Sequence, residues 1–326
     1  MPWFDLSIEE LHAYRTGTAE PAGLDAWWAA RLAEARGKSR PPVLERYKPD
    51  LYAPAEVYDV AFSGARGDRI RAWYLKAATG SAEHAPVVVR FIGYGGGRGL
   101  PAEHMLLPAL GYSAFVMDTR GQGGRWSVGA TEPANSTVMT RDITRPEDYY
   151  FTLLFTDAAR AVETAAELAG EAGRPEASRI AVGGGSQGGG LALAAAALVP
   201  DRVAVCHADI PFLCDIQRAI TLAPAAPYTE VPEFLAQNTA LIPAALDTLR
   251  YVDCALLARR ITAECLLSVG LMDTICPPST VFAAYNEITA GKDIVVHPYT
   301  GHTVPASHAE EQIRHLRRFL PLSERG

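Results

Sequence analysis

Two kinds of hydrophobic pattern divide this chain. In the first, hydrophobic and polar residues alternate along two runs, Val57–Ser63 and Arg69–Leu75, which are joined by a short glycine-containing segment. Alternation with a period of two is typical of strands with one buried face, and the connection predicts an antiparallel hairpin. In the second, the hydrophobic runs are short and continuous: Val87–Ile92, Ser113–Met117, Arg179–Val182, Val203–His207, Glu264–Val269 and Ile294–His297. Such runs suit a parallel sheet that is covered on both faces.

Segments with helical spacing lie between and around these runs. The predicted helices are Glu9–Tyr14, Leu24–Ala35, Tyr150–Ala169, Gly188–Val199, Ser279–Ile288 and Ala309–Leu320. The alternation of strands with helices predicts an α/β fold with a mostly parallel central sheet and helices on both faces. Ser307 and Glu310 have the spacing of a capping box, which predicts that the Ser307 side chain caps the last helix.

Two segments depart from the alternation. We expect residues 1–50 to form an N-terminal helical arm. Residues 211–250 contain several prolines among short helical stretches, and we expect them to be an inserted cap or interface segment. The alternative for this insertion is an irregular surface loop, although structureless loops of that length are uncommon. The whole of residues 1–326 is then a single domain.

Composition excludes several classes of protein. The 326 residues are 48% hydrophobic and 21% charged, which is ordinary for a globular protein. The net charge of −7 argues against nucleic-acid partners and against anionic membrane surfaces. We expect no membrane-spanning segment and no signal peptide, because the hydrophobic runs are short and the first twenty residues are rich in acidic side chains. The five cysteines include no C-x-x-C pair, which favours free buried thiols in a reducing cytoplasm.

The strongest chemical motif is Gly-Gly-Ser-Gln-Gly at residues 184–188. It follows a predicted strand and precedes a predicted helix. In that setting G-x-S-x-G is the pattern of a nucleophile elbow, a sharp turn that holds a serine hydroxyl above the sheet. The hydroxyl of Ser186 would lie at the N-terminus of a helix, where the helix dipole favours a developing negative charge.

A nucleophilic serine needs a base, and the base needs an acid to orient it. Asp273 and His302 follow two later predicted strands, in the chain order serine, acid, histidine. Open α/β sheets place their sites beyond the carboxyl ends of strands, which is where both residues lie. Alternatives remain open: Asp273 could merely cap a turn, His302 could be a surface residue, and His297 or His308 could be the base. The three histidines could also suggest a metal, but no H-E-x-x-H is present and we expect no metal.

Two backbone N–H groups are also needed to stabilise an oxyanion. One is that of Gln187, the residue after the serine. The other is expected in the glycine-rich segment 93–99, and our choice is the N–H of Tyr94. The alternative is that this segment is a loop with no binding role.

A competing motif overlaps the elbow. Residues 183–188 also match G-x-G-x-x-G between a strand and a helix, and Asp209 follows at about the distance of a ribose-binding acid. This pattern would favour an NAD(P)-dependent oxidoreductase. Against it, several strands precede the motif, and the positions of Asp273 and His302 would be coincidental.

The chain resembles carbohydrate esterase family seven, the acetyl xylan esterase and cephalosporin-C deacetylase group, from end to end. The matching strings are residues 4–6 with 9–11, 91–99, 118–123 with its Arg-Gly-Gln, 184–189, 209–214, 268–273 and 276–280. The resemblance implies an α/β-hydrolase fold. It also implies the site residues: a triad of Ser186, Asp273 and His302, oxyanion N–H groups on Tyr94 and Gln187, and Arg120 and Gln122 as braces beside the elbow.

The same resemblance implies hydrolysis of small acetyl esters on xylo-oligosaccharides and on cephalosporin C, without a cofactor. It implies homo-oligomers, usually hexamers, with active sites that face an internal cavity and with residues 211–250 at a subunit interface. One position departs from the family, because Thr303 stands where a glutamate usually follows the histidine.

We therefore expect a serine esterase that removes small acyl groups, most simply acetyl. The alternatives are a hydrolase of another small ester or amide, an NAD(P)-dependent oxidoreductase, and a non-catalytic binding protein with a hydrolase fold.

Overall fold

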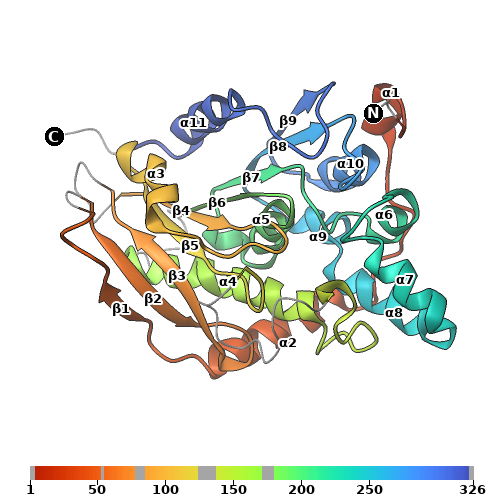
Figure 1. The fold of residues 1–326 in the computed structure, drawn as a ribbon, viewed down its shortest axis with the longest axis horizontal. Helices are drawn as coiled ribbons and strands as arrows, with labels where there is room; N and C mark the ends of the chain where they lie inside the picture. Colours follow the sequence, from red (N-terminus) through yellow and green to blue (C-terminus); the bar gives the residue numbers. More distant parts are fainter. Residues whose placement is uncertain (1–3, 53–54, 78–84, 124–136, 171–179, 323–326) are drawn as a thin grey trace.

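The computed structural model describes residues 4–52, 55–77, 85–123, 137–170 and 180–322 (Figure 1). In this part of the chain one sheet holds nine strands in the order β1-β2-β3-β5-β4-β6-β7-β8-β9. The strands are β1 Val43–Arg46, β2 Val57–Ser63, β3 Arg69–Leu75, β4 Val87–Phe91, β5 Ser113–Met117, β6 Ile180–Gly185, β7 Val205–Asp209, β8 Glu264–Gly270 and β9 Lys292–His297. Strands β4 to β9 are mutually parallel, and β1 to β3 form an antiparallel extension beside β5. The expected α/β fold is confirmed.

The strand boundaries show where the hydrophobic pattern was informative. Strands β2 and β3 match the predicted runs, with Val60 paired opposite Ala72 in the hairpin. Strand β6 continues to Gly185, beyond its predicted end, because its last residues are glycines with no side chains to read. Arg179, its predicted first residue, lies outside the described residues. Strand β1 was not predicted, since all four of its residues are exposed and no alternation marks it.

Helices cover both faces of the sheet. They are α1 Ile8–Ala13, α2 Leu24–Gly37, α3 Leu106–Ala109, α4 Tyr150–Leu168, α5 Gln187–Leu198, α6 Ile216–Leu222, α7 Glu230–Gln237, α8 Ile242–Leu249, α9 Cys254–Leu257, α10 Pro278–Glu287 and α11 His308–Phe319. Helices α4 and α5 pack on one face, where Phe155 and Leu191 join Val89 of β4 in the main core. On the other face Leu316 of α11 packs with Val88 in a separate cluster. Figure 1 shows α11 and α4 on opposite sides of the strands.

The capping prediction at Ser307 was wrong. Ser307 precedes α11 with helical backbone angles, and its side chain makes no capping hydrogen bond. The first N–H groups of the helix are satisfied by the preceding turn instead, because His308 donates to the Pro305 carbonyl and Glu310 to the Ser307 carbonyl.

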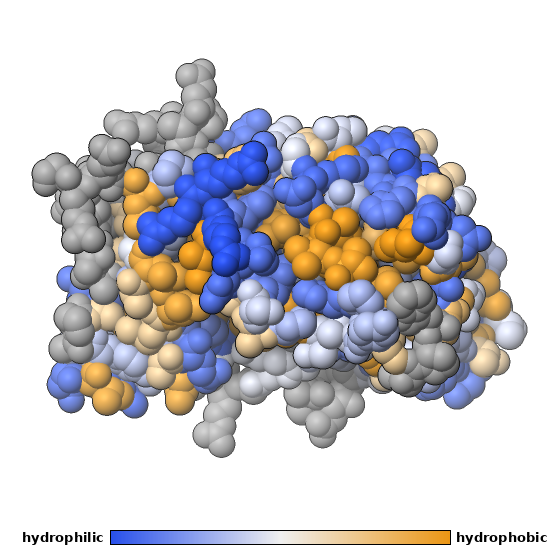
Figure 2. Space-filling model, turned by 90° about the horizontal axis from the view of Figure 1, so that it is seen from above, coloured by the Kyte–Doolittle hydropathy of each residue, from blue (hydrophilic) through white to orange (hydrophobic). Residues whose placement is uncertain are grey.

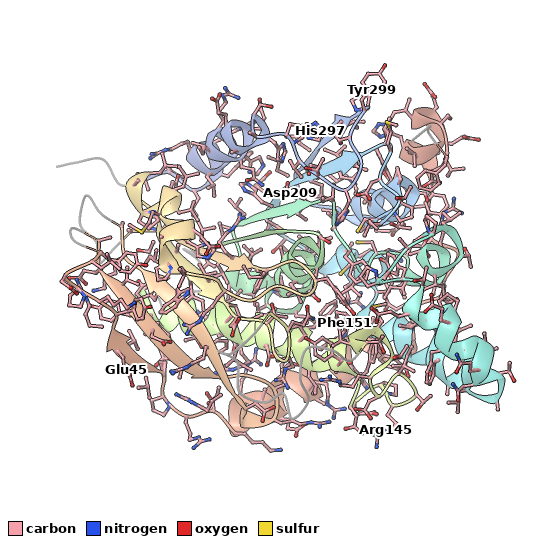
Figure 3. All side chains as sticks on the ribbon, viewed as in Figure 1. Glu45, Arg145, Phe151, Asp209, His297 and Tyr299 are labelled. Atoms are coloured by element: carbon pink, nitrogen blue, oxygen red, sulfur yellow. The ribbon has the colours of Figure 1, made fainter. Side chains whose placement is uncertain are left out.

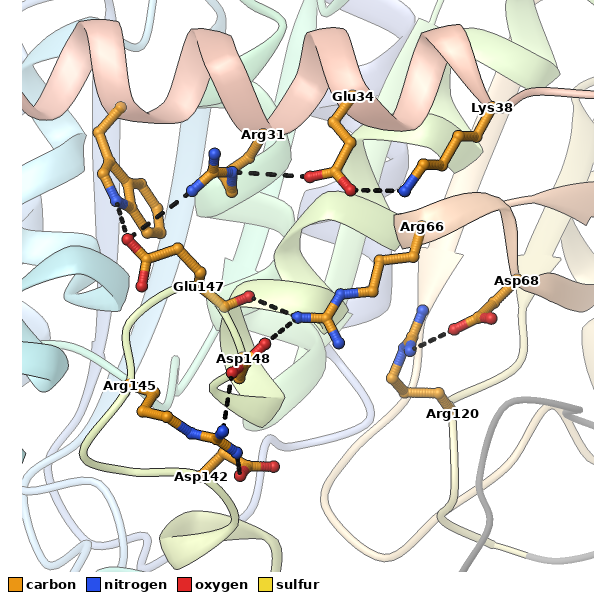
Figure 4. A network of polar contacts seen from close by, with 11 residues as sticks. Arg31, Glu34, Lys38, Arg66, Asp68, Arg120, Asp142, Arg145, Glu147 and Asp148 are labelled. Atoms are coloured by element: carbon orange, nitrogen blue, oxygen red, sulfur yellow. Dashed lines mark hydrogen bonds and ion pairs between the residues drawn. The ribbon is translucent and has the colours of Figure 1, made fainter.

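The described part of the N-terminal segment, residues 4–50, and the insertion both contain helices. Residues 1–50 contain α1 and α2 but also the strand β1, and residues 211–250 contain α6, α7 and α8 in place of an irregular loop. Helix α2 is held by Trp28, whose ring stacks on Phe155 and whose Nε1 donates to the Tyr251 carbonyl at 2.9 Å. Ion pairs such as that of Lys38 with Glu34 follow the exposed side of α2 (Figure 4). Exposed pairs contribute little, so buried contacts hold this helix in place.

Among the described helices none is both long and apolar enough to cross a bilayer. All five cysteines are buried and free.

A buried ion pair joins the hairpin to α4. The Arg120 guanidinium, which follows β5, donates to both carboxylate oxygens of Asp157 at 2.5 and 2.7 Å. Asp157 is fully buried and also accepts from the N–H of Ala65 at 2.8 Å. A third donation from Arg120 reaches Asp68 at 3.0 Å (Figure 4). One carboxylate therefore fixes the hairpin turn, helix α4 and the segment after β5 relative to one another.

Replacing Asp157 with alanine is expected to lower the free energy of unfolding by about 3–5 kcal/mol, because it leaves the Arg120 charge buried without its main partner. Urea unfolding followed by circular dichroism measures this change. The control is Glu310→Ala, which removes an exposed partner of Arg314 and is expected to have no measurable effect. A loss below about 1 kcal/mol for Asp157→Ala would show that the buried pair is dispensable.

Candidate active site

Ser186 occupies a strained turn between β6 and α5. Its backbone has φ 58° and ψ −122°, a conformation that side-chain-bearing residues rarely adopt. The flanking glycines are required by close packing, since a Cβ at Gly184 or Gly188 would lie 2.6 or 2.4 Å from the Phe91 carbonyl oxygen of β4. The turn is held by the Ser186 N–H, which donates to the Asp209 carbonyl at 2.9 Å. The serine thus projects from the end of the sheet at the first turn of α5.

Three side chains from separate strand ends form one hydrogen-bonded line. The Ser186 Oγ lies 2.8 Å from His302 Nε2, and His302 Nδ1 lies 2.8 Å from Asp273 Oδ2. Asp273 is fully buried, whereas a quarter of the His302 side chain is exposed. A carboxylate only accepts hydrogen bonds, so Nδ1 carries the imidazole proton and Nε2 is left to accept from the serine hydroxyl.

Asp273 also holds its own loop. Its other oxygen, Oδ1, accepts hydrogen bonds from the N–H groups of Ile275 at 2.8 Å and Cys276 at 3.0 Å. The turn-capping alternative and the triad assignment are therefore both realised, each by one carboxylate oxygen. This arrangement fixes the direction of the oxygen that faces His302.

The other candidate histidines lie elsewhere. His308 Nε2 is 2.9 Å from Asp209 Oδ1, and the ring of His297 meets the His308 ring edge-on at 5.5 Å. Figure 3 shows Asp209 and His297, which end β7 and β9, with β8 between these two strands in the sheet order. Asp209 also accepts from Ser268 Oγ and from Gln312 Nε2, so three of its roughly four acceptor positions bind protein groups, in place of the ribose hydroxyls that the dinucleotide alternative requires.

Asp273, Cys276 and His302 each place one possible metal-ligand atom within 4.8 Å of the others. Two of the three are already hydrogen-bonded to each other, and the buried Cys276 thiol has a pKa raised by burial, which disfavours the thiolate that metals prefer. The geometry fits a proton-transfer line better than a metal site.

The two N–H groups expected to bind an oxyanion lie beside the elbow. Gln187 is the first residue of α5, and Tyr94 lies in the loop after β4. This loop runs close to the elbow, since a Cβ at Gly93 would lie 3.8 Å from the Gly185 carbonyl oxygen. Within the described part of the chain, neither N–H donates to a protein acceptor, so both remain available to a bound group.

Gln122 connects the two halves of this region. Its side-chain oxygen accepts from the N–H of Gly95 at 2.6 Å, and its amide donates to the Gln187 side chain at 2.9 Å and to the Tyr150 hydroxyl at 2.8 Å. The Tyr150 hydroxyl in turn donates to the Arg120 carbonyl at 2.5 Å. Gln122 therefore sets the position of the Tyr94 loop relative to the first residue of α5.

Sequence reasoning missed Glu230, which comes from α7 in the insertion. The Tyr94 hydroxyl donates to its carboxylate at 2.8 and 3.0 Å, and the N–H of Met139 adds a third hydrogen bond at 3.3 Å. Burial raises the pKa of Glu230, and burial together with the Glu230 carboxylate raises that of Tyr94. Tyr94 and Glu230 are 136 positions apart, so no local pattern could have paired them.

Comparisons with known proteins show the family to which the chain belongs. Residues 1–319 match the acetyl xylan esterase family, AXE1. The chain belongs to the acetyl xylan esterase family. It is an esterase, a carboxylic ester hydrolase, and the resemblance found in the sequence is confirmed.

Individual relatives support the assignment. An acetyl xylan esterase from Paenibacillus sp. R4 superposes with a TM-score of 0.87 at 32% identity, covering 97% of this chain and all of that one. Acetyl xylan esterase 1 from Thermoanaerobacterium sp. JW/SL YS485 gives a TM-score of 0.85 at 33% identity, covering 98% and 99% of the two chains. Acetyl esterase Axe7A from Xylanibacter ruminicola is 26% identical over 313 residues, which is 92% of this chain and 68% of that protein.

Gln122→Ala is expected to lower kcat roughly 10- to 100-fold with little change in KM, because it displaces the Tyr94 loop from Gln187 without touching the serine. Steady-state hydrolysis of p-nitrophenyl acetate measures both constants. The matched control is Gln217→Ala, which removes a comparable side-chain hydrogen bond to the Leu246 carbonyl within the insertion. Equal turnover in the two variants would mean that Gln122 does not position the site.

Proposed function

We propose that this esterase removes O-acetyl groups from acetylated xylo-oligosaccharides and from cephalosporin C through an acyl-enzyme formed on Ser186. The observation that carries the proposal is the line from the Ser186 hydroxyl through His302 to Asp273, with 2.8 Å at each step. The acetyl xylan esterases named above support the choice of the acyl group and of the carbohydrate.

The first half-reaction begins with proton transfer. His302 Nε2 takes the hydroxyl proton of Ser186 as Oγ attacks the ester carbonyl carbon, and Asp273 stabilises the imidazolium that forms. The tetrahedral intermediate collapses when the bond to the sugar oxygen breaks. The imidazolium gives its proton to that oxygen, so the alcohol leaves and an acetyl group remains on Ser186.

The second half-reaction uses the same groups with water. His302 removes a proton from a water molecule, the oxygen attacks the acetyl carbon, and Ser186 recovers its proton as acetate departs. The exposed part of the His302 side chain leaves a route for this water.

Charge on the carbonyl oxygen is stabilised by the backbone in both halves. The N–H groups of Tyr94 and Gln187 would donate to the oxyanion, and the N-terminus of α5 adds its dipole. The loss of one such donor typically costs about 3–4 kcal/mol of transition-state stabilisation. Glu230 holds the Tyr94 side chain by its hydroxyl and so helps to fix the loop that carries this N–H.

Assembly and location follow the same resemblance. We propose a cytoplasmic homo-oligomer, a hexamer by likeness to the family, in which residues 211–250 contribute to a subunit interface. Three ordered helices in that segment and five free, buried cysteines are consistent with this proposal.

A series of p-nitrophenyl esters from acetate to hexanoate tests the proposed substrate class. We expect kcat/KM to fall at least about tenfold between acetyl and butyryl, since each methylene group excluded from a cramped pocket is worth about 1–3 kcal/mol. Ser186→Ala provides the blank and is expected to lose turnover while it remains folded. A preference for butyryl or longer chains would favour a hydrolase of another small ester, and turnover that survives in Ser186→Ala would refute the serine mechanism.

A further inference from the structure

A pocket lies on the α11 face of the sheet. It has a volume of about 220 Å³. Its floor is formed by β4 and β7, through Arg90 and His207, and its walls come from α11 and from the residues around α3. Ser186, Asp273 and His302 are not among its lining residues, so this pocket is separate from the candidate active site.

Arg90 is the distinctive residue of this pocket. It is partly buried, and its guanidinium lies across β6, where a Cβ at Gly183 would be 3.3 Å from Arg90 Nη1. Within the described part of the chain, no protein group forms an ion pair or hydrogen bond with this guanidinium. The N–H donors of this guanidinium are therefore available to a molecule that enters the pocket.

Two carboxylates lie at or beside the pocket, and both accept hydrogen bonds from groups other than Arg90. Asp209 accepts from His308 and Ser268 through one oxygen and from Gln312 through the other. Glu103, at the pocket wall, accepts from the N–H of Leu100 at 2.9 Å. Asp209 attracts Arg90 only through space, and burial still lowers the pKa of the guanidinium. An anion from solution would offset the cost of burying this positive charge.

The two histidines that line the pocket carry no positive charge at neutral pH and so do not attract an anion as Arg90 does. Burial lowers the pKa of His207 to about 3 and lowers that of His104. His104 Nε2 lies 2.8 Å from the Arg98 carbonyl and so carries a proton that is already donated there. At neutral pH the positive charge of the pocket is therefore that of Arg90.

The rest of the lining is largely hydrophobic, with Leu107, Ile313 and Leu316 on the walls. Figure 2 looks down on this side of the molecule and shows hydrophobic surface next to strongly hydrophilic side chains. A planar guanidinium suits the two oxygens of a carboxylate, and hydrophobic walls suit an aliphatic body. We propose that this pocket binds a small aliphatic carboxylate, with its carboxylate on Arg90 and its hydrocarbon part between α3 and α11.

Isothermal titration calorimetry with isovalerate tests the proposal, and isovaleramide is the neutral probe of the same shape. We expect isovalerate to bind wild-type protein with a dissociation constant in the millimolar range and isovaleramide to bind at least tenfold more weakly. Arg90→Gln should weaken isovalerate binding at least tenfold. The matched control is Arg314→Gln, which removes the same charge from the exposed side of α11 and should leave the affinity unchanged.

Ala309→Phe supplies an independent variant, because Ala309 lines the pocket from α11 and a phenyl ring there would fill it while Arg90 is kept. Loss of isovalerate binding in this variant supports the site even if Arg90→Gln does not fold. Isovalerate binding that persists in folded Arg90→Gln or in Ala309→Phe, or that is absent from the wild type, overturns the proposal. None of these outcomes depends on whether Ser186 is the esterase nucleophile.

Discussion

The strained backbone at Ser186 is the constraint on which the rest of the site depends. A residue with φ 58° and ψ −122° costs on the order of 1–3 kcal/mol and persists only when its surroundings enforce it. Two hydrogen bonds hold this conformation: the Ser186 N–H donates to the Asp209 carbonyl, and the Phe212 N–H donates to the Ser186 carbonyl. The flanking glycines allow the turn to pack directly against the backbone of β4. The buried contacts of α5 with β6 and α4 supply the stability that offsets this strain.

That one turn determines where the other groups must be. With the hydroxyl projected beyond the end of β6, the imidazole comes from the loop after β9 and the carboxylate from the loop after β8, because these parallel strands end at the same edge of the sheet. Asp273 divides its oxygens between its own loop and His302, so the acid that orients the base is itself held by the backbone. The oxyanion side is assembled separately, with Gln122 tying the Tyr94 loop to Gln187 and Glu230 securing the Tyr94 hydroxyl.

How much could be read from the sequence depends on how local each signal is. Strands β2 and β3 were predicted to the residue because alternation over seven positions is a strong local pattern, whereas the exposed β1 carries none. Ser186, Asp273 and His302 were found because each sits in a local motif at a strand end, and the structure brings their side chains together. The cap at Ser307 failed because turn carbonyls satisfy the helix start before a side chain is needed.

Residues that act across long sequence separations could not be found this way. Asp157 reaches Arg120 from the middle of α4, and Glu230 reaches Tyr94 from the insertion. In the sequence both look like ordinary acidic residues on helices, and only packing shows that one is buried and that the other is hydrogen-bonded to the oxyanion loop. Arg90 is a similar case, a lone charge in a hydrophobic strand, and only the packing of α3 and α11 shows that its guanidinium lies in a pocket without a bond to any described residue.

The most direct test of the proposed proton-transfer line is the rate at which an organophosphonate ester labels Ser186, followed by intact-mass and peptide mass spectrometry. The account predicts stoichiometric labelling at Ser186 in the wild type and labelling at least about a hundredfold slower in His302→Gln, because the hydroxyl is a weak nucleophile without its base. Labelling at another residue, or at Ser186 with undiminished rate in a folded His302→Gln variant, would contradict it.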